Sequence, residues 1–170
     1  VCVIDANFRR PRLARSFGLE GDQRGLGDVL ADTVTLESAI QMTGDGVSVI
    51  AAGSTETRMV ERLSDERFSS VMASLRSKFS YVLVDVAPAV AATDAIQVAG
   101  RCDASALIIR AGQEQRGLVA RITRELSEAN AIFIGGILNR PRQSVGGYFR
   151  RNYELMASYG QEDEDTEDDS

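Results

Sequence analysis

The chain has 170 residues, 44% of them hydrophobic, with 19 basic and 25 acidic side chains and a formal net charge of -6. Its length predicts one domain with a sizeable core, and no stretch has the length of a membrane span or the layout of a signal peptide. The absence of histidine excludes Ser-His-Asp and Cys-His catalysis and most zinc chemistry, which leaves carboxylate, hydroxyl or phosphate chemistry.

Short apolar runs rich in valine and isoleucine recur along the chain and predict strands at residues 1–5, 47–52, 81–85, 105–111 and 131–138. The runs are mostly continuous, which is typical of strands covered on both faces in a parallel sheet. Helical patterns separate them. The predicted fold is therefore an α/β domain with a doubly wound, mostly parallel sheet and helices on both faces.

Two of the predicted helices carry a clear hydrophobic stripe, and two others are short. The stripes are Phe68, Val71, Met72, Leu75 and Phe79 in one helix and Leu118, Ile122 and Leu126 in the other. The segments 25–32 and 35–40 are expected to form short helices, the second with Thr35 as its cap and Glu37 in its first turn. Cys2 and Cys102 are interpreted as reduced, buried hydrophobic residues of a cytosolic protein.

The regular pattern ends near residue 147, after Pro141, Gly146 and Gly147. We therefore predict a core domain at residues 1–147, to which the nucleotide-binding segments described below belong, and a tyrosine-bearing acidic tail at 148–170. Residues 161–170 carry seven acids and no base, so the remaining 160 residues are almost neutral, and a nucleic acid is not expected as the main partner.

Two predicted strands end in an aspartate, in "VCVID" and "YVLVD". Ligands of an open parallel sheet bind outside the carboxyl ends of its strands, so Asp5 and Asp85 could reach one crevice. Carboxylates there can hold Mg²⁺ or accept a proton from a hydroxyl, as phosphoryl transfer requires. For either aspartate alone, capping of the next helix or turn is the simpler interpretation.

The segments around these aspartates point to a family. "VIDANFRRPRLARSFGL" resembles the Walker A′ segment, and "YVLVDVAPAVAATDA" the Walker B segment, of the bacterial tyrosine kinases of capsule and exopolysaccharide synthesis. These kinases are P-loop ATPases related to MinD and ParA. The resemblance continues through "GLGDVLADTVTLESAI", "VSVIAAG", "LIIRAGQEQRGLVA" and "GGILNR", which covers nearly all of residues 1–147.

The resemblance implies ATP and Mg²⁺ as cofactors and assigns roles to single residues. Asp5 becomes a metal-proximal acid and the candidate base toward the tyrosine hydroxyl, and Asp85 the Walker B acid that orients Mg²⁺. Arg9 matches the Walker A′ arginine. Asn139 and the adjacent Arg140 match the segment that contacts adenine, although a turn residue ending a strand explains Asn139 equally well.

The sequence also departs from the family pattern. Asn7 stands where the family has a second catalytic aspartate, and an amide cannot supply that negative charge. The proline-rich loop of the family is replaced by "STETRMVE". No glycine-rich phosphate loop occurs, and Lys78, the only lysine, is interpreted as a solvated helix-end charge. We expect that this sequence is a fragment cut inside the ATPase domain and that it is inactive by itself.

The tyrosines Tyr148, Tyr153 and Tyr159 lie within twelve residues. An amphipathic closing helix would explain them, whereas the resemblance implies phosphorylation in trans between subunits. The arginines in "FRRPRLAR" are either solvated or bind phosphate or an acidic tail.

Three functions remain open from the sequence. The first is an ATP-dependent protein-tyrosine autokinase that regulates capsular or exopolysaccharide synthesis. The resemblance implies that such a kinase forms rings and works at the inner face of the membrane with a membrane chain-length protein, fused or separate. The second is a MinD- or ParA-like ATPase that positions a partner. The third is a degenerate interaction module without catalysis, for which Asn7 is the best argument.

Overall fold

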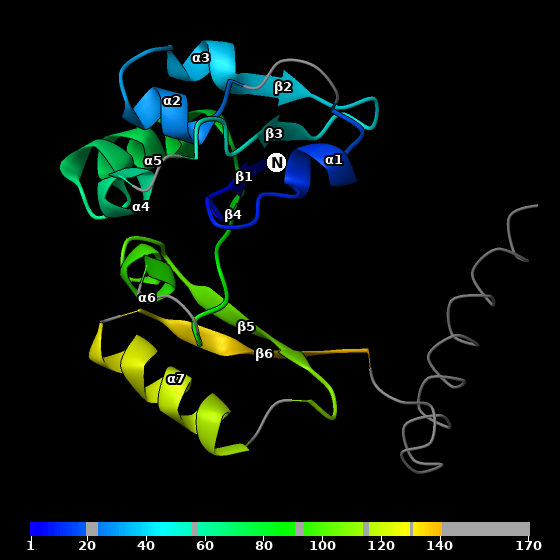
Figure 1. Ribbon diagram of the computed structural model, residues 1–170, viewed down its shortest axis with the longest axis vertical. Coiled ribbons are helices and arrows are strands. Elements are labelled where there is room, and N and C mark those ends of the chain that lie inside the picture. The colour runs from blue at the N-terminus through cyan, green and yellow to red at the C-terminus, as the bar shows by residue number, and fades with distance from the viewer. Residues whose placement is uncertain (20–23, 56–57, 91–93, 114–115, 130, 141–170) are drawn as a thin grey trace, which may run out of the picture. The chain divides into compact units, whose positions relative to one another are not determined.

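The computed structural model describes residues 1–19, 24–55, 58–90, 94–113, 116–129 and 131–140 (Figure 1). The chain forms two compact units. The first comprises Val1–Ser105 and Ala120–Ile134, and the second comprises Ala106–Val119 and the chain from Gly135 onward.

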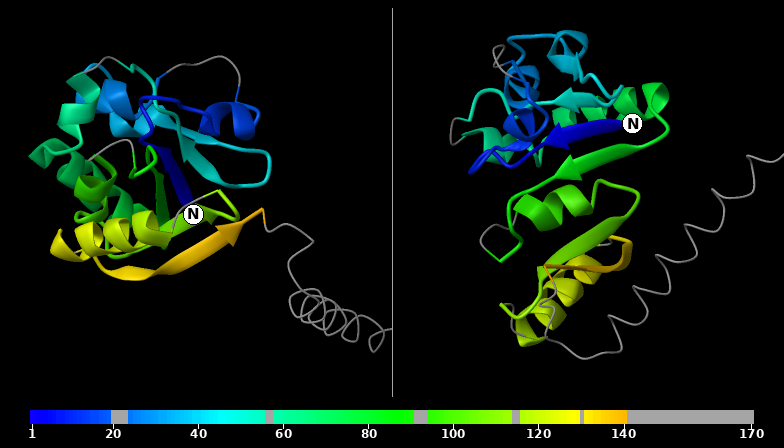
Figure 2. Two further views of the ribbon diagram at one scale, coloured as in Figure 1. Left: turned by 60° about the horizontal axis from the view of Figure 1, so that its bottom comes forward. Right: turned by 90° about the vertical axis from the view of Figure 1, so that its right-hand side faces the viewer.

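The first unit contains a four-stranded sheet in the order β2-β3-β1-β4. Its strands are β1 (Cys2–Asp5), β2 (Ile40–Met42), β3 (Ser48–Ile50) and β4 (Val82–Asp85). Strand β1 pairs in parallel with both β3 and β4, and β2 pairs antiparallel with β3. Figure 2 shows β1 between its two parallel neighbours. The predicted α/β fold with a mostly parallel sheet is confirmed.

Strand β2 was not predicted from the sequence. It has only three residues, "IQM", and lacks a continuous apolar run. The turn that joins it to β3 has a local signal, because Thr43–Gly46 reads "TGDG" and Gly46 adopts a φ of 75°. Glycine tolerates this left-handed conformation without steric cost. Thr43 closes the turn through two hydrogen bonds with Val47. Its N–H donates to the Val47 carbonyl at 2.9 Å, and its hydroxyl oxygen accepts from the Val47 N–H at 3.1 Å.

Seven helices lie in the described residues: α1 (Leu13–Ser16), α2 (Leu26–Leu30), α3 (Leu36–Ala39), α4 (Arg58–Arg62), α5 (Glu66–Lys78), α6 (Asp94–Ala99) and α7 (Arg116–Glu128). The predicted helices correspond to α2, α3, α5 and α7. Thr35 caps α3 as predicted, because its hydroxyl oxygen accepts a hydrogen bond from the Ser38 N–H at 3.3 Å. Helices α1, α4 and α6 have four to six residues, too few to show a hydrophobic period.

The core of the first unit forms where these helices pack on the sheet. Ile4 and Ile50 from the central strands, Leu26 and Leu30 from α2, and Phe68 and Leu75 from α5 are among the fully buried side chains that form it. Each such side chain stabilises the fold by about 1.5–3 kcal/mol. The predicted stripe of α5 is confirmed, and strand β3 is buried at every position, as its continuous apolar run predicted.

The second unit holds most of a two-stranded sheet, formed by β5 (Ser105–Arg110) and β6 (Phe133–Asn139). Beyond the end of β5, the Ala111 N–H donates to the Asn139 carbonyl at 2.9 Å. Helix α7 connects these strands in the sequence, and its predicted stripe is confirmed by the burial of Ile122 and Leu126.

No helix in the described part of the chain is both long and apolar enough to cross a bilayer. Both cysteines are free thiols; Cys2 is buried as predicted, whereas Cys102 is only half-buried. Burial raises the pKa of the Cys2 thiol to about 11, so it remains protonated at neutral pH.

Candidate active site

The parallel strands bring two predicted site residues together. Asp5 ends β1 and Asp85 ends β4, and the two are direct partners in the register of the sheet. Just beyond them, the Ala6 N–H donates a hydrogen bond of 2.8 Å to the Asp85 carbonyl. Because register partners on parallel strands point to the same face, the two side chains lie next to each other at the carboxyl edge of the sheet.

The electrostatics of Asp85 reflect this arrangement. Its pKa is raised above the ordinary value, first because neighbouring protein atoms remove water and second because the negative charge of Asp5 is close. A cation at this edge would relieve the repulsion between the two carboxylates. Carboxylate oxygens are the ligands that Mg²⁺ prefers, and one or two of them are usual when phosphates complete the coordination. The residues present therefore fit a nucleotide-bound Mg²⁺.

A metal ion can also be held by protein side chains alone, which requires a cluster of ligating groups. Within the described ranges, no group of three or more acidic, histidine or cysteine side chains is placed to hold a metal ion. Two carboxylates, such as those of Asp5 and Asp85, are enough for an ion that arrives with a phosphate ligand, as Mg²⁺ does in nucleotide sites.

Asp5 also organises the loop that follows β1. The residue is buried, with 1% of its surface exposed. One carboxylate oxygen accepts hydrogen bonds from the main-chain N–H groups of Arg12 at 2.9 Å and Leu13 at 3.0 Å, and the other accepts from the Asn7 N–H at 3.1 Å. Because Leu13 is the first residue of α1, Asp5 anchors that helix. Helix or turn capping was the simpler interpretation of this residue from the sequence.

Asn7 and Arg9 lie in the same loop. The Asn7 side-chain oxygen accepts a hydrogen bond from the Arg10 N–H at 3.1 Å, which closes a short turn. The Arg9 guanidinium pairs with the Asp94 carboxylate at 3.3 Å. Asp94 begins α6 and was not identified from the sequence, where an acid in a first helical turn looks like an ordinary helix-start residue.

The loop after β3 is held against the start of α2. One Asp28 carboxylate oxygen accepts hydrogen bonds from the N–H groups of Gly25 at 2.9 Å and Ser54 at 3.2 Å. The backbones approach closely: a Cβ atom on Gly27 would lie 2.1 Å from the Ser54 carbonyl oxygen. The glycines of "GLGD" are required by this contact, which the sequence pattern alone did not reveal.

The other predicted site residues do not belong to the first unit or are not described. Asn139 ends β6 in the second unit, and Arg140 follows with a φ of 52°, a turn-like conformation. Their contact with adenine stays a prediction. Tyr148, Tyr153, Tyr159 and the boundary at residue 147 lie outside the described residues.

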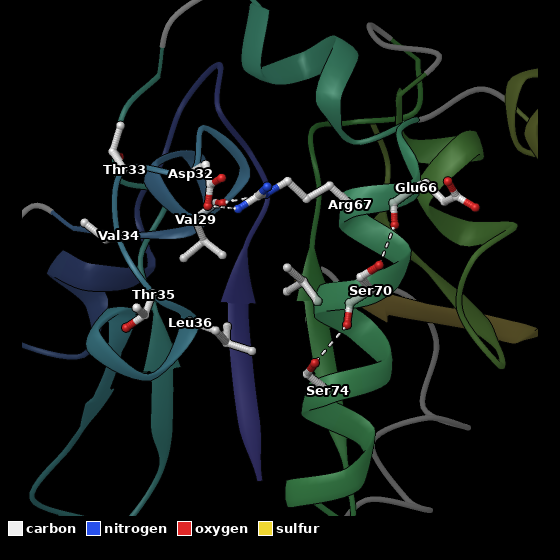
Figure 3. Close-up of a pocket in the computed structure, with 11 residues that line it drawn as sticks. Val29, Asp32, Thr33, Val34, Thr35, Leu36, Glu66, Arg67, Ser70 and Ser74 are labelled. Atoms are coloured by element: carbon white, nitrogen blue, oxygen red, sulfur yellow. Dashed lines mark hydrogen bonds and ion pairs between the residues drawn. The ribbon is translucent and has the colours of Figure 1, made fainter.

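A cleft of about 690 Å³ opens between the α2–α3 segment and α5 (Figure 3). None of the predicted site residues lines it. Arg67 reaches from α5 to Asp32 and to the Val29 carbonyl, and the Ser70 and Ser74 hydroxyls donate back to their own helix. These polar groups already bind one another, so the cleft does not indicate a particular ligand.

Comparisons with known proteins agree with the sequence resemblance. The chain is 31% identical over 149 residues to the tyrosine-protein kinase ptk of Acinetobacter johnsonii, covering 87% of this chain and 20% of that protein. It is 26% identical over 147 residues to the tyrosine-protein kinase CpsD of Streptococcus agalactiae, covering 86% of this chain and 64% of that protein. The chain thus spans less than two thirds of these relatives. No family model matches it.

Solved structures extend this result. The kinase domain of the Escherichia coli tyrosine kinase ETK has a TM-score of 0.80 and 28% identity, and the alignment covers 86% of this chain and 58% of that one. The VpsO kinase domain has a TM-score of 0.78 and 29% identity, with coverages of 83% and 70%. The cell division ATPase MinD of Pyrococcus furiosus, with 23% identity and a TM-score of 0.68, shows the shared fold.

The sequence comparisons and the fold comparisons therefore agree. The resemblance found in the Walker A′ and Walker B segments is confirmed, and this chain is a relative of the bacterial tyrosine kinases, with the P-loop ATPase fold that they share with MinD.

Proposed function

We propose that this chain is the nucleotide-binding part of an ATP-dependent protein-tyrosine kinase that regulates capsular or exopolysaccharide synthesis. The observation that carries the proposal is the register pairing of Asp5 with Asp85 at the carboxyl edge of the sheet, in a chain that is similar to tyrosine kinases. Phosphoryl transfer depends mainly on positioning and charge neutralisation, and two adjacent carboxylates supply an edge that attracts a metal-bound nucleotide.

Asp85 is the proposed metal-holding residue. No hydrogen bond from the described part of the chain reaches its carboxylate, and its pKa is raised by desolvation and by the negative charge of Asp5. When bound, Mg²⁺ would neutralise phosphate charge as the phosphoryl group moves. Asp85 contributes by fixing where that positive charge is held relative to the strand ends.

Asp5 is the proposed second acid and candidate base. Three main-chain N–H groups occupy part of its acceptor capacity, but an ionised carboxylate offers about four lone-pair sites. Its first role is to hold the loop that carries Asn7 and Arg9. Asn7 cannot accept a proton from a tyrosine hydroxyl, so proton transfer in this chain would fall to a carboxylate.

The remaining roles follow the resemblance and stay proposals. Asn139 and Arg140 would contact adenine, and Tyr148, Tyr153 and Tyr159 would accept phosphate from a neighbouring subunit in a ring. One structural neighbour, the chimeric protein CapA2B2, has 20% identity and a TM-score of 0.77, and it supports the fold alone. A membrane chain-length protein at the inner face of the cell membrane is the proposed activator.

The test is tyrosine autophosphorylation by the whole protein that carries this chain. Incubation with Mg²⁺ and radiolabelled ATP should give phosphotyrosine, and Asp85→Asn should lower the rate by about a hundredfold or more. The matched control is Asp103→Asn, which removes an acid from an exposed ion pair with Arg76 and should leave the rate unchanged. Labelled phosphoserine, or no labelled protein at all, would contradict the kinase assignment.

The MinD-like fold supports a second candidate, an ATPase that positions a partner without phosphorylating tyrosine. Release of inorganic phosphate without phosphotyrosine would favour it. The third candidate, a non-catalytic module, is favoured by Asn7 in place of an acid. It predicts that the protein has no measurable affinity for Mg-ATP, which equilibrium binding of a fluorescent ATP analogue would show.

A further inference from the structure

The ion pair between Arg9 and Asp94 joins the chain that follows β1 to the helix that follows β4. The Arg9 Nη2 atom lies 3.3 Å from the Asp94 Oδ2 atom, and 85 residues separate them in the sequence. Strands β1 and β4 are the two that end in Asp5 and Asp85. The pair therefore links the two segments that leave the proposed active site.

Burial distinguishes this pair from the others in the described part of the chain. The Asp94 side chain is 18% exposed, whereas the acids of the other ion pairs given for that part are 38% to 76% exposed. Exposed pairs are worth little because water screens both charges. A sheltered carboxylate holds its partner more firmly, since less water competes for it.

The backbone on both sides of Arg9 is also fixed. The Arg10 N–H donates to the Asn7 side chain, and the Arg12 N–H donates to Asp5. The Arg9 side chain, 52% exposed, is thus anchored at its base by the loop and at its tip by Asp94. Because the contact with Asp94 uses a single Nη2 hydrogen bond, the guanidinium keeps donors that can contact a phosphate, whose oxygens arginine binds in a bidentate manner.

We propose that Asp94 is a positioning residue that holds the Arg9 guanidinium toward the phosphate transferred at the strand ends. The inference rests on the proposed function, because it assumes that a nucleotide binds at Asp5 and Asp85. Asp94 acts only through Arg9. Loss of its charge leaves Arg9 present but free to adopt other rotamers, and the productive orientation is then populated less often.

A double-mutant cycle tests this inference in the whole protein. Asp94→Asn and Arg9→Gln should each lower kcat for autophosphorylation by about tenfold, with a smaller effect on KM for ATP. The double variant should be no slower than Arg9→Gln alone, because Asp94 has nothing left to position. Asp94→Glu should restore part of the rate. Equal additional loss in the Arg9→Gln background would overturn the inference.

A matched cycle on Arg76 and Asp103 serves as the control. This pair has a contact of 2.7 Å between exposed side chains of the same unit. Arg76→Gln and Asp103→Asn should leave kcat unchanged, and all variants should unfold at the same temperature as the wild type within about 2 °C. A lower unfolding temperature for Asp94→Asn with unchanged kcat would show a structural role and contradict the proposal.

A measurement without chemistry separates this inference from the proposed function. Side-chain NMR of arginine, with the Arg9 signal assigned by its loss in Arg9→Gln, should show slowed guanidinium rotation in the wild type and faster rotation in Asp94→Asn. If the wild type hydrolyses ATP without making phosphotyrosine, the kinase assignment fails, and the same cycle on hydrolysis rates still decides the role of Asp94. Identical guanidinium rotation in the wild type and in Asp94→Asn would refute the positioning role of Asp94.

Discussion

Two neighbouring strand ends carry the same residue type with different surroundings. Asp5 at the end of β1 is buried and accepts three main-chain hydrogen bonds, because the chain turns back over it from Asn7 to Leu13. The carboxylate of Asp85 at the end of β4 receives no hydrogen bond from the described residues, and its pKa is raised. The difference shows that the segment after an apolar run decides whether the carboxylate of its terminal aspartate is held by main-chain hydrogen bonds or is left without them.

Asp5→Ala should produce the largest loss of stability. It leaves the N–H groups of Asn7, Arg12 and Leu13 without their charged acceptor, and we expect the free energy of unfolding to fall by about 3 kcal/mol. Urea denaturation followed by circular dichroism measures this change. Asp85→Ala is the matched control and should unfold at the same or a higher urea concentration. Equal destabilisation by both changes would remove the distinction between the two strand ends.

Asp85→Asn should separate ligand binding from stability. Removing this charge relieves its desolvation and its repulsion with Asp5, so the nucleotide-free protein should melt at a slightly higher temperature. The Mg²⁺-dependent part of nucleotide affinity should fall by about a hundredfold. Differential scanning fluorimetry with and without Mg-ATP measures both effects. A variant that melts earlier yet keeps Mg²⁺-dependent binding would reverse the two proposed roles.

The raised pKa of Asp85 predicts a particular pH dependence. A carboxyl group whose folded-state pKa is raised keeps its proton to higher pH, so Mg²⁺ affinity should be lost on acidification earlier than at an ordinary aspartate. The folded state also binds this proton more tightly than the unfolded state. The stability cost of the Asp85 charge is therefore present above the raised pKa and is relieved as pH falls toward 3.8. Titration with Mg²⁺ between pH 4 and pH 8 checks the predicted loss of affinity, with Asp85→Asn as control. A Mg²⁺ affinity that does not change with pH would contradict the prediction.

Asn7→Asp should have the smallest effect on the fold. A carboxylate can accept the Arg10 N–H as the amide does, so stability should change by less than about 0.5 kcal/mol. The added negative charge near Asp5 should strengthen Mg²⁺ affinity by several-fold, a change of about 1 kcal/mol. Isothermal titration of Mg²⁺ into the nucleotide complex measures it. Weaker affinity would indicate that the charge disturbs the loop that Asp5 anchors.

The sequence predicted the local features of the fold well, because they depend on neighbouring residues. The apolar run of β3, the stripe of α5 and the cap at Thr35 follow from spacing and residue type within a few positions. Strand β2 was not predicted because three residues carry too little periodicity. It exists because β3 offers it a pairing edge.

The candidate site also has some features that follow from the sequence and others that only the structure shows. The residue pattern determined that two predicted strands end in aspartates and that parallel strands place such ends on one edge. Only the tertiary structure decided that Asp5 and Asp85 are register partners, that Asp5 anchors α1, and that Asp94 holds Arg9. Contacts of this second kind join segments as much as 85 residues apart, and their geometry is set by how strands and helices pack, which no short stretch of sequence contains.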